Sequence, residues 1–368
     1  MLYQRDLTSY LLEKGLLEPG SIVSGDLILQ DASRRNRNFK ILSKQGRCYF
    51  LKQGIGPLPS IEREAAIYRF LSSLPGGPYL AGCLPAISFH DPARHILVLE
   101  IPPKTETLDE YCRWAGRTPT WAGELLGRAL GDVHRLTRDQ AIEESQGARF
   151  AEESPWVFRI HEPVPRIFWG SSEANQRLVR IIQEFMGLRE HLDSLREDWR
   201  VECLIHGDLK SPNLVLERGP SGRVRRALKI VDWELAGFGD AAWDIGSVLS
   251  DSLALWLLSI PMGHEMPVEQ SLGLARLPLK AIAPAMQSFW SAYVDQRDLD
   301  SKGADELLRR SASHAAARLL QTAYETTRQS SQIPANILYM VQLSWNMMRS
   351  PSAAVAELLG LTGTEEIS

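Results

Sequence analysis

Residues 203–246 read CLIHGDLKSPNLVLERGPSGRVRRALKIVDWELAGFGDAAWDIG, and this stretch decides how the rest of the chain is interpreted. Apolar residues enter a tight turn at His206 to Asp208, and Asn213 then begins a short strand. The turn RGPSG and the apolar run ALKIV predict a return strand that ends at Asp232. Because the two strands of a hairpin run antiparallel, Asn213 and Asp232 are expected close together at one end of it.

These side chains suit phosphoryl transfer. An amide oxygen beside a carboxylate favours Mg²⁺, which takes oxygen ligands and shares them with substrate phosphates, so Asn213 and Asp232 are the predicted metal ligands. Asp208, on the loop just before the hairpin, can accept the proton of an attacking hydroxyl. The protein mostly positions groups and neutralises charge in this reaction, so one base and one metal pair are a sufficient core. Either HGD or DWE alone could be an ordinary turn, but the order and spacing of the motifs favour the catalytic interpretation.

The pattern HGDxxxxN, followed about twenty residues later by an apolar run and DWE, resembles the aminoglycoside phosphotransferase and choline kinase-like family, relatives of protein kinases. The resemblance implies an α+β, two-lobed protein-kinase-like fold with a small β-rich N-lobe and a larger, mainly helical C-lobe. It also implies that Asp208 is the catalytic base and that Asn213 and Asp232 bind the metal. His206 resembles a loop-orienting residue. Lys210 resembles the lysine of Ser/Thr protein kinases that helps to neutralise the transferring phosphoryl group.

Two further aspartates of the segment correspond to family positions. Asp244, in AAWDIG, resembles the buried aspartate that hydrogen-bonds the catalytic loop and holds its shape. Asp240, in GFGD, matches the GD that usually follows the metal-binding turn, and we expect it to have a structural role.

The N-terminal part of the chain has the pattern of a small α+β lobe over residues 1–102. Strands are expected from about Ser21 to Gln53, around the polar turn DASRRNRN. A helix is expected from Ser60, as its N-cap, to the Pro-Gly-Gly stop after residue 74. The apolar strand 95–101 then runs into Pro102, which marks the joint between the lobes.

This lobe supplies the candidates for nucleotide binding. Lys52, at the end of the strand CYFLK, is placed as the family's phosphate-binding lysine, and Glu64 as its helix partner. Glu62 is the alternative partner, on a different face of the same helix. Glu100 and Ile101 are the candidates for backbone contacts to the base, because the two prolines after them have no N–H to donate. The co-substrate is expected to be ATP, with GTP as the alternative.

The turn that would cover the phosphates contains no glycine. The segment from Asn36 to Lys40 fits relatives that have Ser or Asn followed by an aromatic and a basic residue, so Asn36 is a candidate for nucleotide binding. Arg34, Arg35 and Arg37 suit either phosphate contacts or a solvated hairpin tip.

Residues 103–368 are expected to be mainly helical, with the catalytic loop, the metal site and the acceptor-binding helices. Helices are predicted over Trp121–Leu136 and Gln176–Leu195. Further helices are expected after Asp244, with proline-bearing breaks at 261–267 and 277–284.

Composition limits the function classes. The formal net charge is −4, from 41 basic and 45 acidic residues, which argues against a nucleic-acid binder. The four cysteines lack metal-ligand spacing and suit free thiols in a reducing compartment. The N-terminus lacks the apolar core of a signal peptide, and the most apolar window, Leu253–Ile260, is too short to span a bilayer. A cytoplasmic protein with no membrane partner is expected.

The phosphate acceptor stays open at this stage. The helical insert at about 137–200 contains the run SPWVFRIHEPVPRIFWG, which is rich in Pro, Trp and Arg. That composition suits an acceptor with anionic or apolar parts, or an extended peptide, better than a polycation. Three interpretations follow: a small-molecule kinase, a peptide Ser/Thr kinase of peptide natural-product maturation, and a non-catalytic pseudokinase. The presence of Lys52, Asp208, Asn213 and Asp232 argues against the third.

Overall fold

The computed structural model describes residues 2–33, 36–43, 46–55, 60–138, 154–162, 171–219, 221–261 and 268–362. The chain divides into two compact units, which we call the β unit and the helical unit. The β unit comprises Met1–Thr107 and Asn213–Ala236, and the helical unit comprises Leu108–Pro212 and Gly237–Ser368. The predicted hairpin therefore belongs to the β unit, although both of its flanking segments belong to the helical unit.

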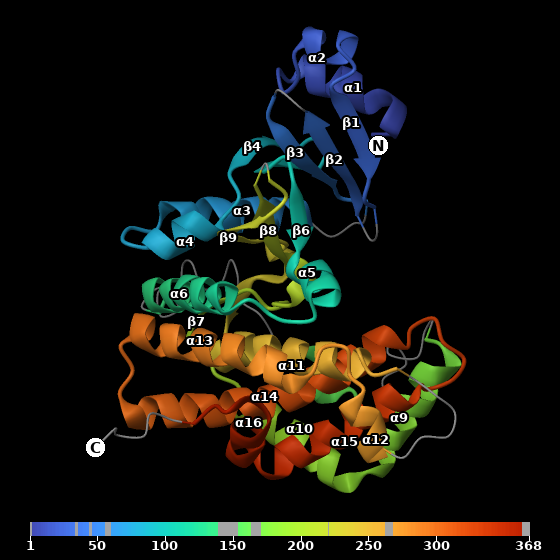
Figure 1. Ribbon diagram of the computed structural model, residues 1–368, viewed down its shortest axis with the longest axis vertical. Coiled ribbons are helices and arrows are strands. Elements are labelled where there is room, and N and C mark those ends of the chain that lie inside the picture. The colour runs from blue at the N-terminus through green and yellow to red at the C-terminus, as the bar shows by residue number, and fades with distance from the viewer. Residues whose placement is uncertain are drawn as a thin grey trace. The chain divides into compact units, whose positions relative to one another are not determined.

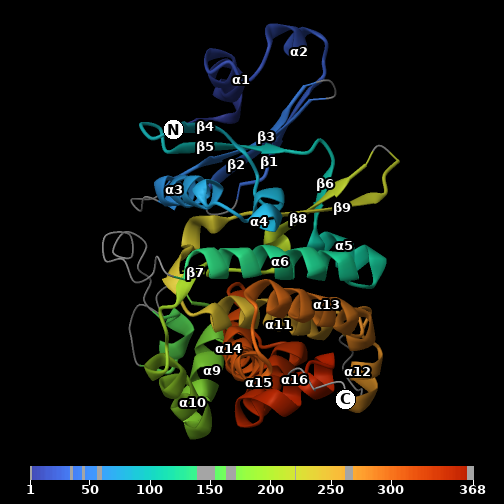
Figure 2. The same cartoon turned by 90° about the vertical axis from the view of Figure 1, so that its left-hand side faces the viewer.

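The main sheet of the β unit is antiparallel and has the strand order β1-β2-β3-β5-β4 (Figure 1 and Figure 2). Its strands are β1 (Leu27–Asp31), β2 (Arg37–Ser43), β3 (Cys48–Gln53), β4 (Ile87–Asp91) and β5 (Ile96–Ile101). Every second residue of β2 from Phe39 on is buried, as expected for a sheet covered on one face. The apolar residues Leu7 and Leu11 of α1 (Gln4–Glu13) belong to the same core.

A second, three-stranded sheet holds the predicted hairpin. Its order is β6-β8-β9, from β6 (Thr105–Thr107), β8 (Leu214–Arg218) and β9 (Val224–Ile230). Leu214 pairs with Ile230, and the carbonyl oxygen of Asn213 accepts from the N–H of Val231 at 3.0 Å. The hairpin prediction is confirmed, and Asn213 lies opposite the residue that precedes Asp232.

The remaining elements of the β unit are short helices. They are α2 (Pro19–Val23), α3 (Ser60–Ser73), α4 (Pro78–Cys83) and the 3₁₀ turn η4 (Trp233–Leu235). The helix predicted from Ser60 is present as α3. The strand predicted from Ser21 is wrong over its first six residues, since β1 begins at Leu27. The first three of them lie in α2, because Pro19 at the first helical position favours a helix start there.

The helical unit consists of helices around one short strand pair, β7 (Cys203–Ile205) with β10 (Gly237–Gly239). Its helices are α5 (Leu108–Ala115), α6 (Thr120–Leu136), η2 (Trp156–Arg159), α9 (Glu173–Glu184), α10 (Met186–Glu197), α11 (Ala241–Leu258), α12 (Val268–Gly273), α13 (Leu279–Arg297), α14 (Ser301–Thr326), α15 (Ala335–Arg349) and α16 (Pro351–Leu359). The 3₁₀ turn η3 (Ser211–Asn213) leads out of this unit. None of the described helices is long and apolar enough to cross a membrane.

Helices α6 and α13 run side by side (Figure 2) and approach closely because two glycines of α6 face α13. A Cβ atom on Gly123 would lie 2.1 Å from the carbonyl oxygen of Ala285, and one on Gly127 would lie 2.3 Å from that of Phe289. Both distances are far below van der Waals contact, so only glycine allows this packing. The helix predicted over Trp121–Leu136 is confirmed as α6.

Two helix predictions of this unit need correction. The single helix predicted over Gln176–Leu195 is two helices, α9 and α10, because the backbone is extended at Phe185, with ψ at 92°. The break predicted at 277–284 is also too long. Pro284 lies inside α13, which continues because its residues Ala285 and Phe289 are buried. Residues 139–153 and 163–170 of the predicted helical insert lie outside the described residues.

The predicted fold class is confirmed in these features. The chain has a smaller β-rich unit with a five-stranded antiparallel sheet and a larger, mainly helical unit.

Candidate active site

Lys52 is the centre of a buried ionic cluster in the β unit. Its Nζ donates to the two carboxylate oxygens of Glu64 at 2.8 and 2.9 Å, and to Oδ1 of Asp232 at 2.5 Å. Lys52 and Glu64 are buried, at 4% and 0% exposure. The alternative partner, Glu62, contacts His95 instead. The structure thus brings together three of the predicted residues, from β3, α3 and the end of the hairpin.

The charge state of Lys52 follows from this cluster. Burial alone would lower the pKa of Lys52, but Glu64 and Asp232 raise it above its ordinary value. The lysine therefore stays charged. A buried cation held between two carboxylates can bind phosphates when an oxygen of the nucleotide takes part in the same network.

Asp232 has a strained backbone. Its φ of 71° and ψ of 50° lie in the left-handed region, which residues other than glycine occupy rarely and at a cost of about 1–3 kcal/mol. Such strain persists where the surroundings impose it, and it concentrates at functional sites. Asp232 caps η4 at this point, directly after the second strand of the hairpin. The conformation turns the chain sharply and so determines where the carboxylate lies.

Asn213 and Asp232 fit a magnesium ion. Among the described residues there is no group of three or more His, Cys, Asp or Glu side chains that could hold a metal ion. Mg²⁺ needs fewer protein ligands, because substrate phosphates and water complete its octahedron. An amide and a carboxylate at one end of the hairpin meet that requirement.

The other nucleotide-binding candidates lie at the edges of the main sheet. The Nδ2 of Asn36 donates to Oε2 of Glu234 at 3.2 Å, so the glycine-free turn contacts the DWE segment. The N–H of Glu100 donates to the carbonyl oxygen of Ala86, and Ile101 pairs with Cys48. Arg34 and Arg35 lie outside the described residues.

In the helical unit, Asp244 of α11 holds the loop that carries Asp208. Its carboxylate accepts from the backbone N–H of His206 at 2.7 Å and from that of Gly207 at 3.0 Å. The Nε1 of Trp243 donates to the carbonyl oxygen of Gly207 at 3.0 Å. Gly207 has φ at 79°, a conformation that glycine adopts without strain.

Inside the loop, the Nδ1 of buried His206 accepts from the backbone N–H of Asp208 at 3.3 Å. Farther along, the N–H of Ser211 donates to Oδ2 of Asp251 at 2.8 Å. Burial raises the pKa of Asp251 to about 6. Helix α11 thus holds the loop at both ends. Asp251 was not predicted from the sequence, although its spacing of seven from Asp244 places both on one helix face.

Asp208 forms two ion pairs. The Nζ of Lys210 lies 2.7 Å from Oδ2, and the Nη2 of Arg318 on α14 contacts Oδ1. Arg318 was not predicted from the sequence either. Its only signal is that it is a single charged residue inside the apolar run HAAARLL.

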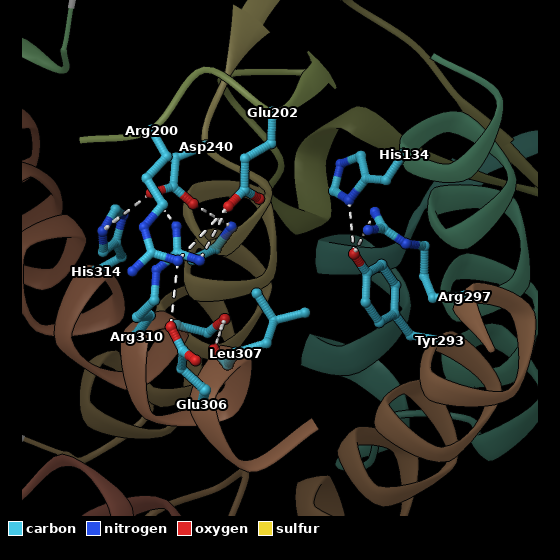
Figure 3. Close-up of polar contacts among 12 residues, drawn as sticks. His134, Arg200, Glu202, Asp240, Tyr293, Arg297, Glu306, Leu307, Arg310 and His314 are labelled. Atoms are coloured by element: carbon cyan, nitrogen blue, oxygen red, sulfur yellow. Dashed lines mark hydrogen bonds and ion pairs between the residues drawn. The ribbon is translucent and has the colours of Figure 1, made fainter. Parts of the chain in front are cut away.

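Asp244 has a third contact, with His134 of α6. The Nε2 of His134 lies 3.4 Å from Oδ2 of Asp244. Its Nδ1 lies 2.8 Å from the hydroxyl of Tyr293 (Figure 3). Burial lowers the pKa of His134. The neutral imidazole then donates from Nε2 to the carboxylate and accepts the tyrosine proton at Nδ1.

Asp240 is a structural residue in this arrangement. Its Oδ1 accepts from the N–H of Ala242 at the start of α11, and its Oδ2 pairs with Arg310 at 2.5 Å. Arg310 also pairs with Glu202, which lies directly before β7 (Figure 3). These contacts join the start of α11 to the strand that leads into the catalytic loop.

The sequence profile of the phosphotransferase enzyme family matches residues 28–261. This span includes Lys52, Glu64 and the whole segment 203–246. The chain belongs to this family. Its membership confirms the predicted phosphotransferase class.

Solved structures of low sequence identity are similar to the chain. One is a streptomycin–ATP–APH(2″)-IIa ternary complex, with 13% identity, coverage of 95% of this chain and 99% of that chain, and a TM-score of 0.49. Another is the choline kinase LicA from Streptococcus pneumoniae, with 15% identity, coverage of 92% and 99%, and a TM-score of 0.44. A third is the macrolide 2′-phosphotransferase MphH from Brachybacterium faecium, with 17% identity, coverage of 97% and 99%, and a TM-score of 0.47. No curated protein matches the chain.

Proposed function

We propose that this protein transfers the γ-phosphoryl group of ATP to a hydroxyl group of a small molecule. The observation that carries the proposal is the buried cluster of Lys52, Glu64 and Asp232. Burying a charged lysine between two carboxylates is unfavourable, so the cluster indicates a functional site. Binding of phosphates and a metal ion by the same network would explain it.

In this proposal Lys52 contacts the nucleotide phosphates, and Glu64 keeps the lysine in place. Asn213 and Asp232 hold Mg²⁺, which neutralises negative charge on the phosphates when it is bound. The left-handed backbone of Asp232 holds the carboxylate in the conformation this needs.

Asp208 accepts the proton of the attacking hydroxyl, and Lys210 stabilises the charge of the transferring phosphoryl group. His206 and Asp244 keep the loop in its shape through the hydrogen bonds to its backbone. The helical unit thus holds the base Asp208 in a fixed position, because the loop that carries Asp208 is hydrogen-bonded at both ends.

We further propose that residues 1–102 bind the nucleotide and that residues 103–368 provide the base and the acceptor site. Asn36 contacts the phosphates, and the backbone of Glu100 and Ile101 contacts the base of the nucleotide. The N–H of Glu100 donates to Ala86, which leaves the backbone of Ile101 for contacts with the nucleotide base.

A peptide Ser/Thr kinase is the second candidate. It is supported by Lys210 and by Trp156, an aromatic residue of the insert that is 39% exposed. A pseudokinase is disfavoured, because the residues for the base, the metal and the phosphates are all present.

The test measures Mg²⁺-dependent ATP turnover for the wild type and for Asp208→Asn. A general base contributes about 10²–10⁴-fold, so we expect a loss in that range. Asp305→Asn, an exposed aspartate on α14, is the control and should leave turnover unchanged. Turnover that survives the Asp208 substitution would contradict the assignment of the base. Mass spectrometry of metabolite and peptide pools, with a gain of about 80 Da for a phosphoryl group, then identifies the acceptor class.

A further inference from the structure

One face of α14 contacts the proposed base. Arg318, Gln321 and Glu325 are spaced by three and four residues, so they lie on one side of the helix. The Nη2 of Arg318 contacts Oδ1 of Asp208, and its Nη1 lies 3.8 Å from Oε1 of Glu325. The Nε2 of Gln321 donates to the same Oε1 at 2.9 Å. These residues lie outside the span matched by the family profile, which ends at residue 261.

Two buried atoms of this face lack a hydrogen-bond partner among the described residues. They are Nη1 of Arg318, a donor, and Oε1 of Gln321, an acceptor. Arg318 is 3% exposed and Gln321 is 8% exposed. An unsatisfied buried polar group costs about 1–3 kcal/mol, so such a pair indicates a place where a ligand completes the hydrogen bonds.

The two oxygens of Asp208 are held differently. Oδ1 pairs with Arg318, whose side chain is 4% exposed and therefore has little freedom to move. Oδ2 pairs with Lys210, whose side chain is 32% exposed. An entering hydroxyl therefore displaces Lys210 more readily than Arg318. Oδ2 is then the oxygen that takes the proton, while Oδ1 stays with the arginine.

The hydrogen-bonding groups of this face without a partner among the described residues indicate which functional groups an acceptor needs. The gap of 3.8 Å between Nη1 of Arg318 and Oε1 of Glu325 suits one group that accepts from the first and donates to the second. A hydroxyl does both, whereas an ammonium group cannot accept, and a peptide carbonyl cannot donate. A second hydroxyl would donate to Oε1 of Gln321. The cations Arg318 and Lys210 are balanced by the carboxylates of Asp208 and Glu325, so this position offers no excess negative charge to a polycation.

We propose that Arg318, Gln321 and Glu325 form the acceptor-binding face and that they select a neutral, polyhydroxylated acceptor. Arg318 is in addition a positioning residue for Asp208. In the reaction, the acceptor hydroxyl loses its proton to Oδ2 of Asp208. Its oxygen forms a bond to the γ-phosphorus as the bond between that phosphorus and the leaving ADP oxygen breaks. This inference rests on the proposed function.

The experiment uses the full chain with MgATP and four acceptor probes: methyl α-glucoside, myo-inositol, an aminoglycoside and a serine-containing peptide. We expect the highest kcat/KM for one of the two neutral polyols. Arg318→Met should lower kcat about 100-fold, because a misplaced base loses about that factor. Gln321→Leu should raise the KM of the polyol about tenfold through one lost hydrogen bond.

Arg318→Lys separates the two roles of the arginine. A lysine can restore the ion pair with Oδ1 but lacks the second donor at the position of Nη1. We expect kcat to lie within about tenfold of the wild type, since the ion pair is restored, while the KM of the polyol is raised because the donor at Nη1 is lost. If Arg318 had a purely structural role, Arg318→Lys would not restore kcat while leaving KM raised. Arg309→Met, an exposed arginine on the same helix, is the matched control and should change neither parameter.

Three outcomes would overturn the inference while the proposed function stands. They are a higher kcat/KM for the aminoglycoside or the peptide, an unchanged KM in Gln321→Leu, and no transfer to either polyol while ATP is still hydrolysed. If the wild-type protein turns over no MgATP with any probe or with water, the proposed function itself is wrong, and the inference falls with it.

Discussion

The two units hold their charged groups in different ways. In the β unit, Lys52 is buried between the carboxylates of Glu64 and Asp232, and side-chain ion pairs carry the arrangement. In the helical unit, the loop around Asp208 is held mainly through backbone N–H groups, which donate to Asp244 and Asp251 of α11. The first arrangement stabilises a charge, and the second fixes the path of the chain. We therefore expect substitutions in the β unit to act first on stability and those in the loop to act first on turnover.

The largest effect on stability is expected for Lys52→Met. It leaves Glu64 buried without its partner, and breaking a buried ion pair in this way costs about 3–5 kcal/mol. The double substitution Lys52→Met with Glu64→Leu should recover part of that loss, because it removes the unpaired charge. Urea denaturation monitored by circular dichroism measures the free energy of unfolding.

Lys40→Met on the neighbouring strand β2 is the control for this prediction. Lys40 has no ion pair among the described residues, and we expect little change in stability. If Lys52→Met were as stable as Lys40→Met, the contrast between the units would be wrong.

The second prediction concerns Asp244→Asn. The amide keeps one acceptor oxygen but loses the charge that two backbone N–H groups share, and a hydrogen bond to a charged group contributes about 1.5–3 kcal/mol. We expect a loss of about 2 kcal/mol in stability and a larger effect on turnover, about 100-fold, because the base shifts with its loop. Parallel measurement of kcat and of urea denaturation, with Asp305→Asn as control, checks this. A fall in stability with unchanged kcat would mean that the loop keeps its shape without the charge.

The third prediction concerns Asp251 and depends on pH. Burial raises its pKa from 3.8 to about 6, so the folded protein binds this proton more tightly than the unfolded chain does. Ionising Asp251 therefore costs stability as the pH rises from about 4 to about 6, and the cost is constant above that range.

Asp251→Asn removes this dependence. We expect its stability relative to the wild type to rise by about 1–3 kcal/mol between pH 4 and pH 7, as measured by urea denaturation across that range. If the difference in stability between Asp251→Asn and the wild type did not change with pH, Asp251 would ionise at its ordinary pKa, and burial would not act on this end of the loop.

Much of this arrangement could be read from short stretches of sequence. Turn residues and apolar runs predicted the hairpin that carries Asn213 and Asp232, because turns and strand pairing are local. The order of strand, helix and loop motifs indicated Lys52 and Glu64. The errors came where local signals were ambiguous. Pro284 was interpreted as a helix break, although burial of the residues after it keeps α13 continuous.

The segment 203–246 predicted the reaction class from the sequence alone, because HGDxxxxN followed by DWE has the order and spacing of the phosphotransferase family's motifs. Only the tertiary structure decided what surrounds the base. Arg318 lies 110 positions from Asp208, and no periodicity or spacing links two residues so far apart in the chain. Packing of α14 within the helical unit brings them together. The physical reason is that local propensity specifies elements and turns, whereas the contacts of a buried charge depend on which helix faces it.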